Sequence, residues 1–297
     1  MGMERQVFPV AYDIIILGSG PAGLAAAVAA RGRDKSVLVI GNRWQDSPLA
    51  RAELVDNYLG LPGRTGRELL QAFYSHAQET GAEFVVGRAI SLMAWNGFMV
   101  TVGSEVYEGR ALILAPGVVR QAKFPGEEEF SGRGVSYCAT CDGMLYRNKA
   151  VAVVGRAPDA PQEANYLHSL GCQVTYVSQK EPEGLAEGIP SVTASRLAIK
   201  GENAVTALEA DGQEIPCAGV FVLRQAVAPV DLLPGLETQG HYIKVDRRMA
   251  TNVEGVFAAG DCVGEPLQVA KAVGEGHAAA LSACEFLEPV FISENAG

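Results

Sequence analysis

Two cysteines separated by two residues, Cys138 and Cys141, are followed directly by Asp142. Such a pair can form a structural disulfide, provide half of a zinc site or act as a redox dithiol. Zinc needs two further ligands, and the chain has no second CxxC motif and only four isolated histidines, so no metal site is expected. An acid beside the second cysteine can exchange a proton with a thiolate leaving group. The pattern predicts a catalytic dithiol with Asp142 as acid and base; a structural disulfide and a turn-forming Asp142 are the alternatives.

The remaining four cysteines lie singly in apolar stretches, which is typical of buried free thiols. They are Cys172, Cys217, Cys262 and Cys284. A chain with one CxxC pair and otherwise unpaired cysteines fits a reducing compartment, where such a pair is more often catalytic than structural. The expected location is therefore cytoplasmic.

A glycine pattern near the start of the chain indicates dinucleotide binding. Gly18, Gly20 and Gly23 follow an apolar run with the character of a buried parallel strand. The first glycine permits a tight turn, the second lets a pyrophosphate approach the backbone, and the third allows a helix to pack on the strand. The helix that begins near Pro21 and Ala22 would offer free N–H groups to the phosphates. A glycine-rich turn without a ligand is the alternative.

The acid that often binds the ribose in NAD-binding units is missing from this chain. After the second strand, at the place where that acid is expected, the chain has Gly41 and Asn42. Their presence weakens a simple NAD interpretation and leaves FAD open.

Residues near the other end of the chain give a second indication of a flavin. Gly260 and Asp261 follow an apolar strand, and an aspartate at a strand end can accept hydrogen bonds from ribitol hydroxyls. Gln268 and Val269 begin the last helix, whose N-terminal dipole can stabilise negative charge on a reduced flavin. A helix-capping aspartate and an ordinary first-turn glutamine are the alternatives.

A second strand-to-helix turn begins at Gly155 but lacks the second glycine of the pattern. Ala157 adds a Cβ where a pyrophosphate should approach the backbone, and Pro158 and Pro161 remove N–H donors. After the next strand, residues 178–180 include one lysine and no arginine that could bind a 2′-phosphate. The pattern predicts a dinucleotide-type unit that serves as a scaffold and binds no NADPH.

These residues need two α/β units to position them, because apolar strands and helices alternate twice along the chain. The expected strands are 12–17, 36–40, 111–115, 150–155, 173–177 and 256–259, and the expected helices are 24–30, 69–79, 162–170 and 268–286. Short antiparallel strands are expected over 192–215. The predicted fold class is α/β, with two Rossmann-like, three-layer ββα domains of the FAD/NAD(P)-binding type, the second inserted in the first.

Length and composition agree with two domains. The chain has 297 residues, and 48% of them are hydrophobic, enough for two cores. The predicted FAD-binding domain is discontinuous, with residues 1–117 and 243–297, and residues 118–242 form a degenerate NAD(P)-type domain carrying the dithiol. The net charge of −10 argues against a binder of nucleic acid backbones. No apolar run reaches the roughly 18 residues of a membrane span, so no membrane association is expected.

At this point the sequence resembles the low-molecular-weight thioredoxin reductase family over nearly its whole length. The matching stretches are 18–23, 55–58, 138–143 and 256–261, with the sequences GSGPAG, VDNY, CATCDG and VFAAGD. The combination of CxxCDG with a C-terminal Gly-Asp motif is highly specific for that family.

The resemblance implies an FAD domain, an inserted domain with the dithiol, a homodimer and a thioredoxin-like protein partner. By position, Asn57, Asp261 and Gln268 would contact FAD. Cys141 would lie nearer the flavin and receive its electrons. Cys138 would attack the substrate disulfide.

The chain departs from that family where the family binds NADPH: the second glycine pattern is broken, and Ser178-Gln179-Lys180 replaces a basic His-Arg-Arg run. Some members that are independent of pyridine nucleotides take electrons from ferredoxin, and others carry a second FAD in place of NADPH. The leading hypothesis is an FAD-dependent disulfide oxidoreductase fed by ferredoxin. The alternatives are a two-flavin enzyme, an NADPH-thioredoxin reductase and a non-enzymatic flavin/dithiol redox sensor.

Overall fold

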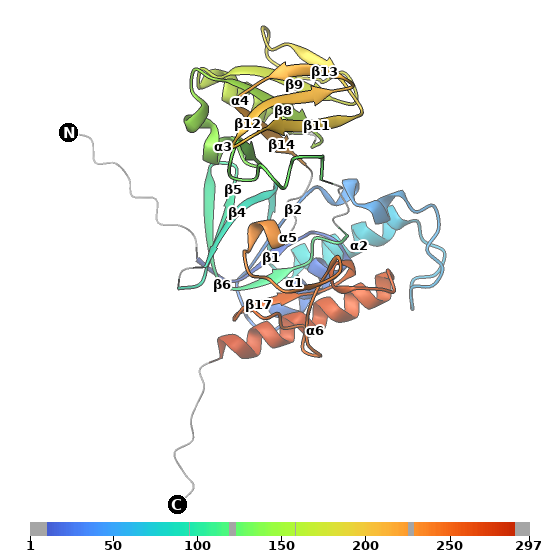
Figure 1. Cartoon of the computed structure of the whole chain (residues 1–297). Helices are drawn as coiled ribbons and strands as arrows, with labels where there is room; N and C mark the ends of the chain where they lie inside the picture. Colours follow the sequence, from blue (N-terminus) through green and yellow to red (C-terminus); the bar gives the residue numbers. More distant parts are fainter. Residues whose placement is uncertain (1–10, 95, 119–122, 158, 225–228, 289–297) are drawn as a thin grey trace, which may run out of the picture. The chain divides into compact units, whose positions relative to one another are not determined.

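The chain packs into two compact units in the computed structural model, which describes residues 11–94, 96–118, 123–157, 159–224 and 229–288 (Figure 1). Unit 1 comprises Met1–Val119 and Ala228–Gly297, and unit 2 comprises Arg120–Val227. The chain therefore returns to unit 1 at residue 228, whereas the sequence analysis expected this return at residue 243.

A mixed sheet forms the centre of unit 1, with the strand order β3-β2-β1-β6-β5-β4. The strands are β1 (Ala11–Leu17), β2 (Val37–Gly41), β3 (Glu83–Val86), β4 (Ala89–Ala94), β5 (Phe98–Val102) and β6 (Glu105–Leu114). The first half of β6 pairs antiparallel with β5, and its second half pairs parallel with β17 (Val256–Ala258). Residues from the two ends of the sequence therefore meet at the carboxyl ends of the parallel strands.

Three helices support this sheet: α1 (Pro21–Arg31), α2 (Gly66–Glu79) and α6 (Val269–Leu287). Alanine-rich faces of α1 and α6 pack closely, and a Cβ at Gly276 of α6 would overlap the backbone of Ala22 in α1. The α2 helix begins with a complete capping box between Thr65 and Glu68. Close helix packing fixes the first turns of α1 and α6 relative to the strand ends.

Unit 2 contains a five-stranded parallel sheet with the order β10-β9-β8-β14-β7 and a separate antiparallel sheet, β11-β12-β13. Its strands are β7 (Val135–Ser136), β8 (Ala150–Gly155), β9 (Gln173–Ser178), β10 (Ser191–Thr193), β11 (Leu197–Gly201), β12 (Val205–Ala210), β13 (Gln213–Pro216) and β14 (Gly219–Leu223). The helices that concern the site are α3 (Ala139–Asp142) and α4 (Ala160–Ser169), and the 3-10 turn η3 (Gly143–Tyr146) follows α3. Separate apolar clusters pack on the β8–β14 sheet.

The predicted α/β class with two Rossmann-like units is confirmed. One detail is wrong: β10, at the start of the region predicted to be antiparallel, pairs parallel with β9. Twelve residues separate Ser178 from Ser191, enough chain to cross back, so the local alternation pattern could not reveal the direction of pairing.

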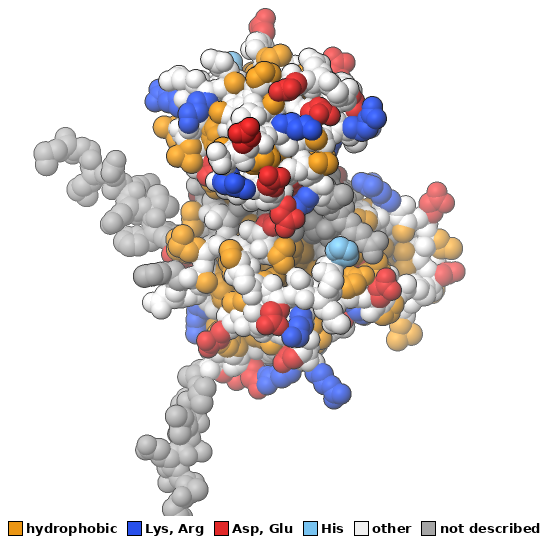
Figure 2. Space-filling view, in the orientation of Figure 1, with side chains coloured by type: hydrophobic (Ala, Val, Ile, Leu, Met, Phe, Trp, Pro, Cys, Tyr) orange, Lys and Arg blue, Asp and Glu red, His pale blue; other side chains and the backbone are white. Residues whose placement is uncertain are grey.

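The surface of the described residues carries both signs of charge. Figure 2 shows acidic and basic side chains interspersed over the visible face of each unit. Across the described parts of the chain, no helix is long and apolar enough to cross a membrane.

Candidate functional site

The turn between β1 and α1 contains three glycines with different surroundings. A Cβ at Gly18, which has φ +127°, would overlap the carbonyl of Ala115, and a Cβ at Gly23 would overlap the carbonyl of Gly18. In contrast, a Cβ at Gly20 would meet nothing within 4 Å. Gly18 and Gly23 are therefore required by packing, whereas Gly20 leaves an open approach to the backbone.

The first turn of α1 leaves backbone donors available. Its first residue is Pro21, which has no N–H, and its first helical hydrogen bond runs from Leu24 N to Gly20 O at 2.9 Å. The N–H groups of Ala22 and Gly23 have no acceptor among the residues that the structure describes. Free N–H groups at the positive end of a helix are the donors that a pyrophosphate needs.

Asp261 follows β17 in a turn that packs against the first turn of α1. Gly260 has φ +86°, and a Cβ there would lie 2.8 Å from the Cβ of Ala22. Burial raises the pKa of the half-buried Asp261 carboxyl, Lys271 opposes this rise and Glu275 adds to it. The structure thus brings the predicted Gly-Asp motif next to the predicted glycine turn.

Asn57 and Gln268 meet although they are 211 positions apart in the sequence: Asn57 Nδ2 donates to Gln268 Oε1 at 2.9 Å. Gln268 is the N-cap of α6 and Val269 is its first residue. Two of the predicted flavin contacts therefore lie side by side at the start of α6.

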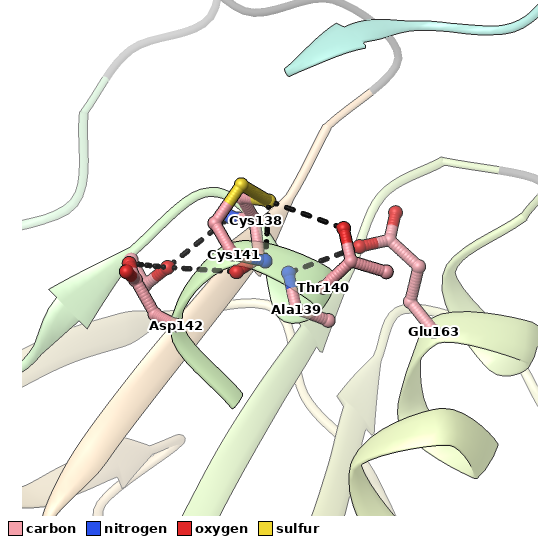
Figure 3. Close-up of a disulfide and its surroundings, with 7 residues drawn as sticks. Cys138, Ala139, Thr140, Cys141, Asp142 and Glu163 are labelled. Atoms are coloured by element: carbon pink, nitrogen blue, oxygen red, sulfur yellow. Dashed lines mark hydrogen bonds between the residues drawn. A yellow bond between two sulfur atoms is a disulfide. The ribbon is translucent and has the colours of Figure 1, made fainter. Parts of the chain in front are cut away.

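Cys138 and Cys141 form a disulfide at the start of the short helix α3 in unit 2 (Figure 3). Cys138 is the N-cap, and its Sγ accepts the N–H of Cys141 at 2.9 Å. Cys138 is buried and Cys141 is exposed. The two cysteine residues therefore differ in exposure, although the ring that holds them is small.

Asp142 is connected to the disulfide through Ser136. The Ser136 hydroxyl donates to Asp142 Oδ2 at 2.7 Å and accepts the N–H of Cys138 at 3.1 Å. The Thr140 hydroxyl lies 3.4 Å from Cys138 Sγ, and Glu163 of α4 accepts the N–H of Ala139 at 3.3 Å. The CxxC motif gave no signal for these three residues, because Ser136 and Glu163 lie outside it and Thr140 occupies one of its two variable positions.

The four cysteines outside the CxxC pair behave as expected from the sequence. All four are free and buried. Burial raises the pKa of the Cys217 thiol to about 11 and that of Cys262 to about 12. Such thiols are poor nucleophiles at neutral pH, because the thiolate is the reactive form.

In the turn between β8 and α4, backbone N–H groups donate hydrogen bonds to carbonyl oxygens of the protein itself. The N–H groups of Arg156 and Ala157 both donate to Leu223 O, at 2.8 and 3.0 Å. The N–H groups at the start of α4 are also engaged: Ala160 donates to Ala157 O, and Gln162 and Glu163 donate to Asp159 O. Pro161 has no N–H, and Pro158 lies outside the described residues.

Side chains occupy the space next to this turn. A Cβ at Gly155 would overlap the hydroxyl of the buried Tyr176. The guanidinium of Arg224 lies 5.0 Å from the centre of the Phe124 ring, and that of Arg156 lies 5.7 Å from it. The fully buried Glu127 forms a two-point ion pair with Arg224, with one contact of 2.6 Å.

Comparison with known proteins decides the family. A family model described as pyridine nucleotide-disulphide oxidoreductase matches residues 12–276. The chain belongs to this family. It is 33% identical over 302 residues to the thioredoxin reductase of Bacillus subtilis, covering 93% of this chain and 95% of that protein.

Solved structures of the family give the same result. A ferredoxin-flavin thioredoxin reductase from Clostridium acetobutylicum has a TM-score of 0.88 at 41% identity, covering 94% of this chain and 98% of that one. A thioredoxin reductase from Gloeobacter violaceus has a TM-score of 0.77 at 34% identity, covering 94% of each chain. The protein is a thioredoxin reductase-like, flavin-dependent disulfide oxidoreductase, and its family implies FAD as the cofactor.

Proposed function

We propose that this family member reduces a thioredoxin-like protein with electrons from a one-electron donor, ferredoxin, instead of NADPH. The observation that carries the proposal is the turn at residues 155–163, where the N–H groups of Arg156, Ala157, Ala160, Gln162 and Glu163 are engaged and Tyr176 fills the space beside Gly155. With these donors engaged, a hydride carrier lacks the usual phosphate anchor in this unit. The similarity to a ferredoxin-flavin thioredoxin reductase supports the same donor class.

FAD fits the described residues of unit 1, because Gly20 leaves an open approach beside two unused N–H groups. In the proposal, the pyrophosphate is held at the start of α1, and the ribitol and flavin are held by residues at the strand ends and at the start of α6. The residues proposed to hold the pyrophosphate are Gly18, Gly20, Pro21, Ala22 and Gly23. The residues proposed to hold the ribitol and flavin are Asn57, Gly260, Asp261, Gln268 and Val269. FAD accepts electrons singly or in pairs, so it can collect two electrons from a one-electron donor and pass them on as the pair that reduces a disulfide.

The dithiol carries the pair of electrons onward. Reduction of the disulfide breaks the S–S bond with two electrons and two protons and yields two thiols. Cys141, the exposed sulfur, is proposed to receive the electrons, and Asp142 is proposed to move the proton. Cys138 then attacks the partner's disulfide as a thiolate, and Cys141 resolves the mixed disulfide, which re-forms the ring and leaves the partner as a dithiol. Because Cys138 is buried, its sulfur must become accessible when the ring opens.

Anaerobic titration tests the choice of donor. Reduced ferredoxin is expected to bleach the flavin absorbance and to produce thioredoxin thiols, whereas NADPH is expected to leave the spectrum unchanged over minutes. Rapid bleaching by NADPH would contradict the proposal and favour an ordinary NADPH-thioredoxin reductase.

Flavin content and turnover test for a two-flavin enzyme and for a redox sensor. One FAD per chain after extraction is expected, and two per chain would support the enzyme with a second FAD. Turnover of thioredoxin with ferredoxin separates an enzyme from a redox sensor, which would show flavin reduction without turnover. We also propose a homodimer, to be measured by light scattering, and a cytoplasmic reaction, which the four free cysteines fit.

A further inference from the structure

Two charged residues near the start of α6 contact the backbone of the Gly-Asp turn. Lys271 Nζ donates to Gly264 O at 2.7 Å and to Gly260 O at 3.2 Å. Glu275 Oε2 accepts the N–H of Gly260 at 3.0 Å and forms an ion pair with Lys271 at 2.9 Å. Only 17% of the Lys271 side chain and 20% of the Glu275 side chain are exposed.

The turn that this pair holds has an unusual backbone. Gly260 and Gly264 have φ values of +86° and +136°, conformations that L-residues rarely adopt, and Asp261 lies between them. Hydrogen bonds from Lys271 and Glu275 join α6 to both ends of this turn. The backbone on both sides of Asp261 is therefore held by α6 as well as by its own strand.

Packing alone does not explain a charged pair at this place. Burial of two ions is costly before their attraction is counted, and apolar residues of similar volume often pack at least as well. Lys271 also lies in the first turn of α6, where the helix dipole disfavours a cation. A positive charge here does, however, favour the ionised form of the neighbouring Asp261.

We propose that Lys271 is a positioning residue for FAD: it holds the Gly-Asp turn and places a positive charge near Asp261, so that this carboxylate can accept hydrogen bonds from the ribitol hydroxyls. Glu275 completes the contact by fixing the Lys271 ammonium and the N–H of Gly260. The inference rests on the proposed role of Asp261 in binding FAD. It assigns the lysine a part in cofactor affinity that acts through Asp261.

A double-mutant cycle on the apoprotein tests this coupling, with FAD dissociation constants measured by quenching of FAD fluorescence. Asp261→Asn and Lys271→Met are each expected to weaken binding about tenfold, the loss of one charge-assisted contact. In the Asp261→Asn background, Lys271→Met is expected to add less than about twofold, because coupled residues are not additive. Lys271→Arg, which keeps the charge, is expected to retain affinity within about threefold of the unchanged chain.

Two controls separate this role from a general loss of stability. Lys244→Met removes a lysine from an exposed ion pair with Glu237 in the same unit, at 2.8 Å, and is expected to leave FAD affinity unchanged. Circular dichroism and thermal unfolding of each apoprotein report on folding. If Lys271→Met fails to fold, Lys271→Gln, which keeps a donor without the charge, enters the same cycle.

The outcomes are distinct. An unchanged affinity in Lys271→Met, or an equal loss in both backgrounds, overturns the coupling through Asp261 and leaves the proposed function intact. An unchanged affinity in Asp261→Asn overturns the assignment of Asp261 itself, and the inference fails with it.

Discussion

The two strand–turn–helix regions of the chain, β1 to α1 and β8 to α4, have the same architecture but use their backbone N–H groups differently. In both, a buried parallel strand leads through a turn into a helix that begins with or near a proline. In the first, Ala22 and Gly23 keep N–H groups without acceptors in the described chain. In the second, Leu223 O and Asp159 O accept four N–H groups between them. The same strand–turn–helix fold therefore occurs with different numbers of free N–H groups, and the proposed loss of NADPH binding rests on this difference.

The difference also concerns side chains. Beside Gly20 there is open space, whereas beside Gly155 the hydroxyl of Tyr176 occupies the position of a Cβ. The second region has a partly buried aromatic and arginine cluster around Phe124 and Glu127. In the second region, groups that could bind a ligand contact other parts of the protein instead. Three mutational experiments sharpen this comparison.

The largest effect is expected from Arg224→Met. Glu127 is fully buried, and removal of its arginine leaves an unpaired charge in the core of unit 2, which costs about 3–5 kcal/mol of unfolding free energy. Urea unfolding measures the loss. If the cluster is purely structural, FAD content stays at one per chain.

A paired substitution and a surface control complete this experiment. The double variant Glu127→Gln/Arg224→Met is expected to recover part of the stability, because it removes the uncompensated charge. Arg196→Met removes a largely exposed partner of Asp211 and is expected to change stability by less than about 1 kcal/mol. A loss below that value in Arg224→Met would show that Glu127 does not depend on the arginine.

The second experiment adds a side chain to the first turn and removes one from the second turn. Gly20→Val puts a side chain into the open approach and is expected to weaken FAD binding about 100-fold, or nearly 3 kcal/mol. Ala157→Gly restores the missing glycine of the second turn, but the donors there stay engaged. It is therefore expected to give no reduction by NADPH in the anaerobic titration. Reduction by NADPH in Ala157→Gly would mean that the Cβ of Ala157 prevents NADPH binding at the second turn, and that the hydrogen bonding of its backbone N–H groups does not.

Much of this contrast could be predicted from the sequence, because it depends on local chemistry. Glycine spacing after an apolar strand predicted the first turn, and Ala157 with two prolines predicted a defective second turn. The family resemblance named Asn57 and Gln268 as separate FAD contacts, but it did not predict their hydrogen bond to each other, since no local pattern connects residues 211 positions apart.

The residues that occupy the space beside the second turn and those that hold the Gly-Asp turn could not be predicted in this way. Tyr176 looks like an ordinary strand residue until the sheet register places its hydroxyl beside Gly155. Lys271 and Glu275 look like an exposed i,i+4 pair, and their partial burial appears only when α6 packs on the Gly-Asp turn. Long-range packing decides these cases, and it is not encoded in a short window of sequence.

The smallest effect concerns the stability of the apoprotein. Burial raises the pKa of Asp261 in the folded chain, so the folded state binds this proton more tightly than the unfolded state does. Stability that depends on this group is present at low pH and falls as pH rises from the ordinary pKa of an aspartate through the raised one. Asp261→Asn removes the charged form, and at pH 7 the apoprotein is expected to melt at a slightly higher temperature. At pH 3.5, near the ordinary pKa of about 3.9, the difference is expected to shrink.

The matched control for this experiment comes from the second turn. Asp159 is the N-cap of α4, and its side chain is exposed and makes no capping hydrogen bond. Asp159→Asn is therefore expected to leave the pH dependence of melting unchanged. A lower melting temperature in Asp261→Asn at pH 7 would show that the ionised carboxylate stabilises the apoprotein. A higher one would mean that the Gly-Asp turn, which packs against the first turn, keeps a half-buried charge at a cost in stability, as a site made for a ligand does.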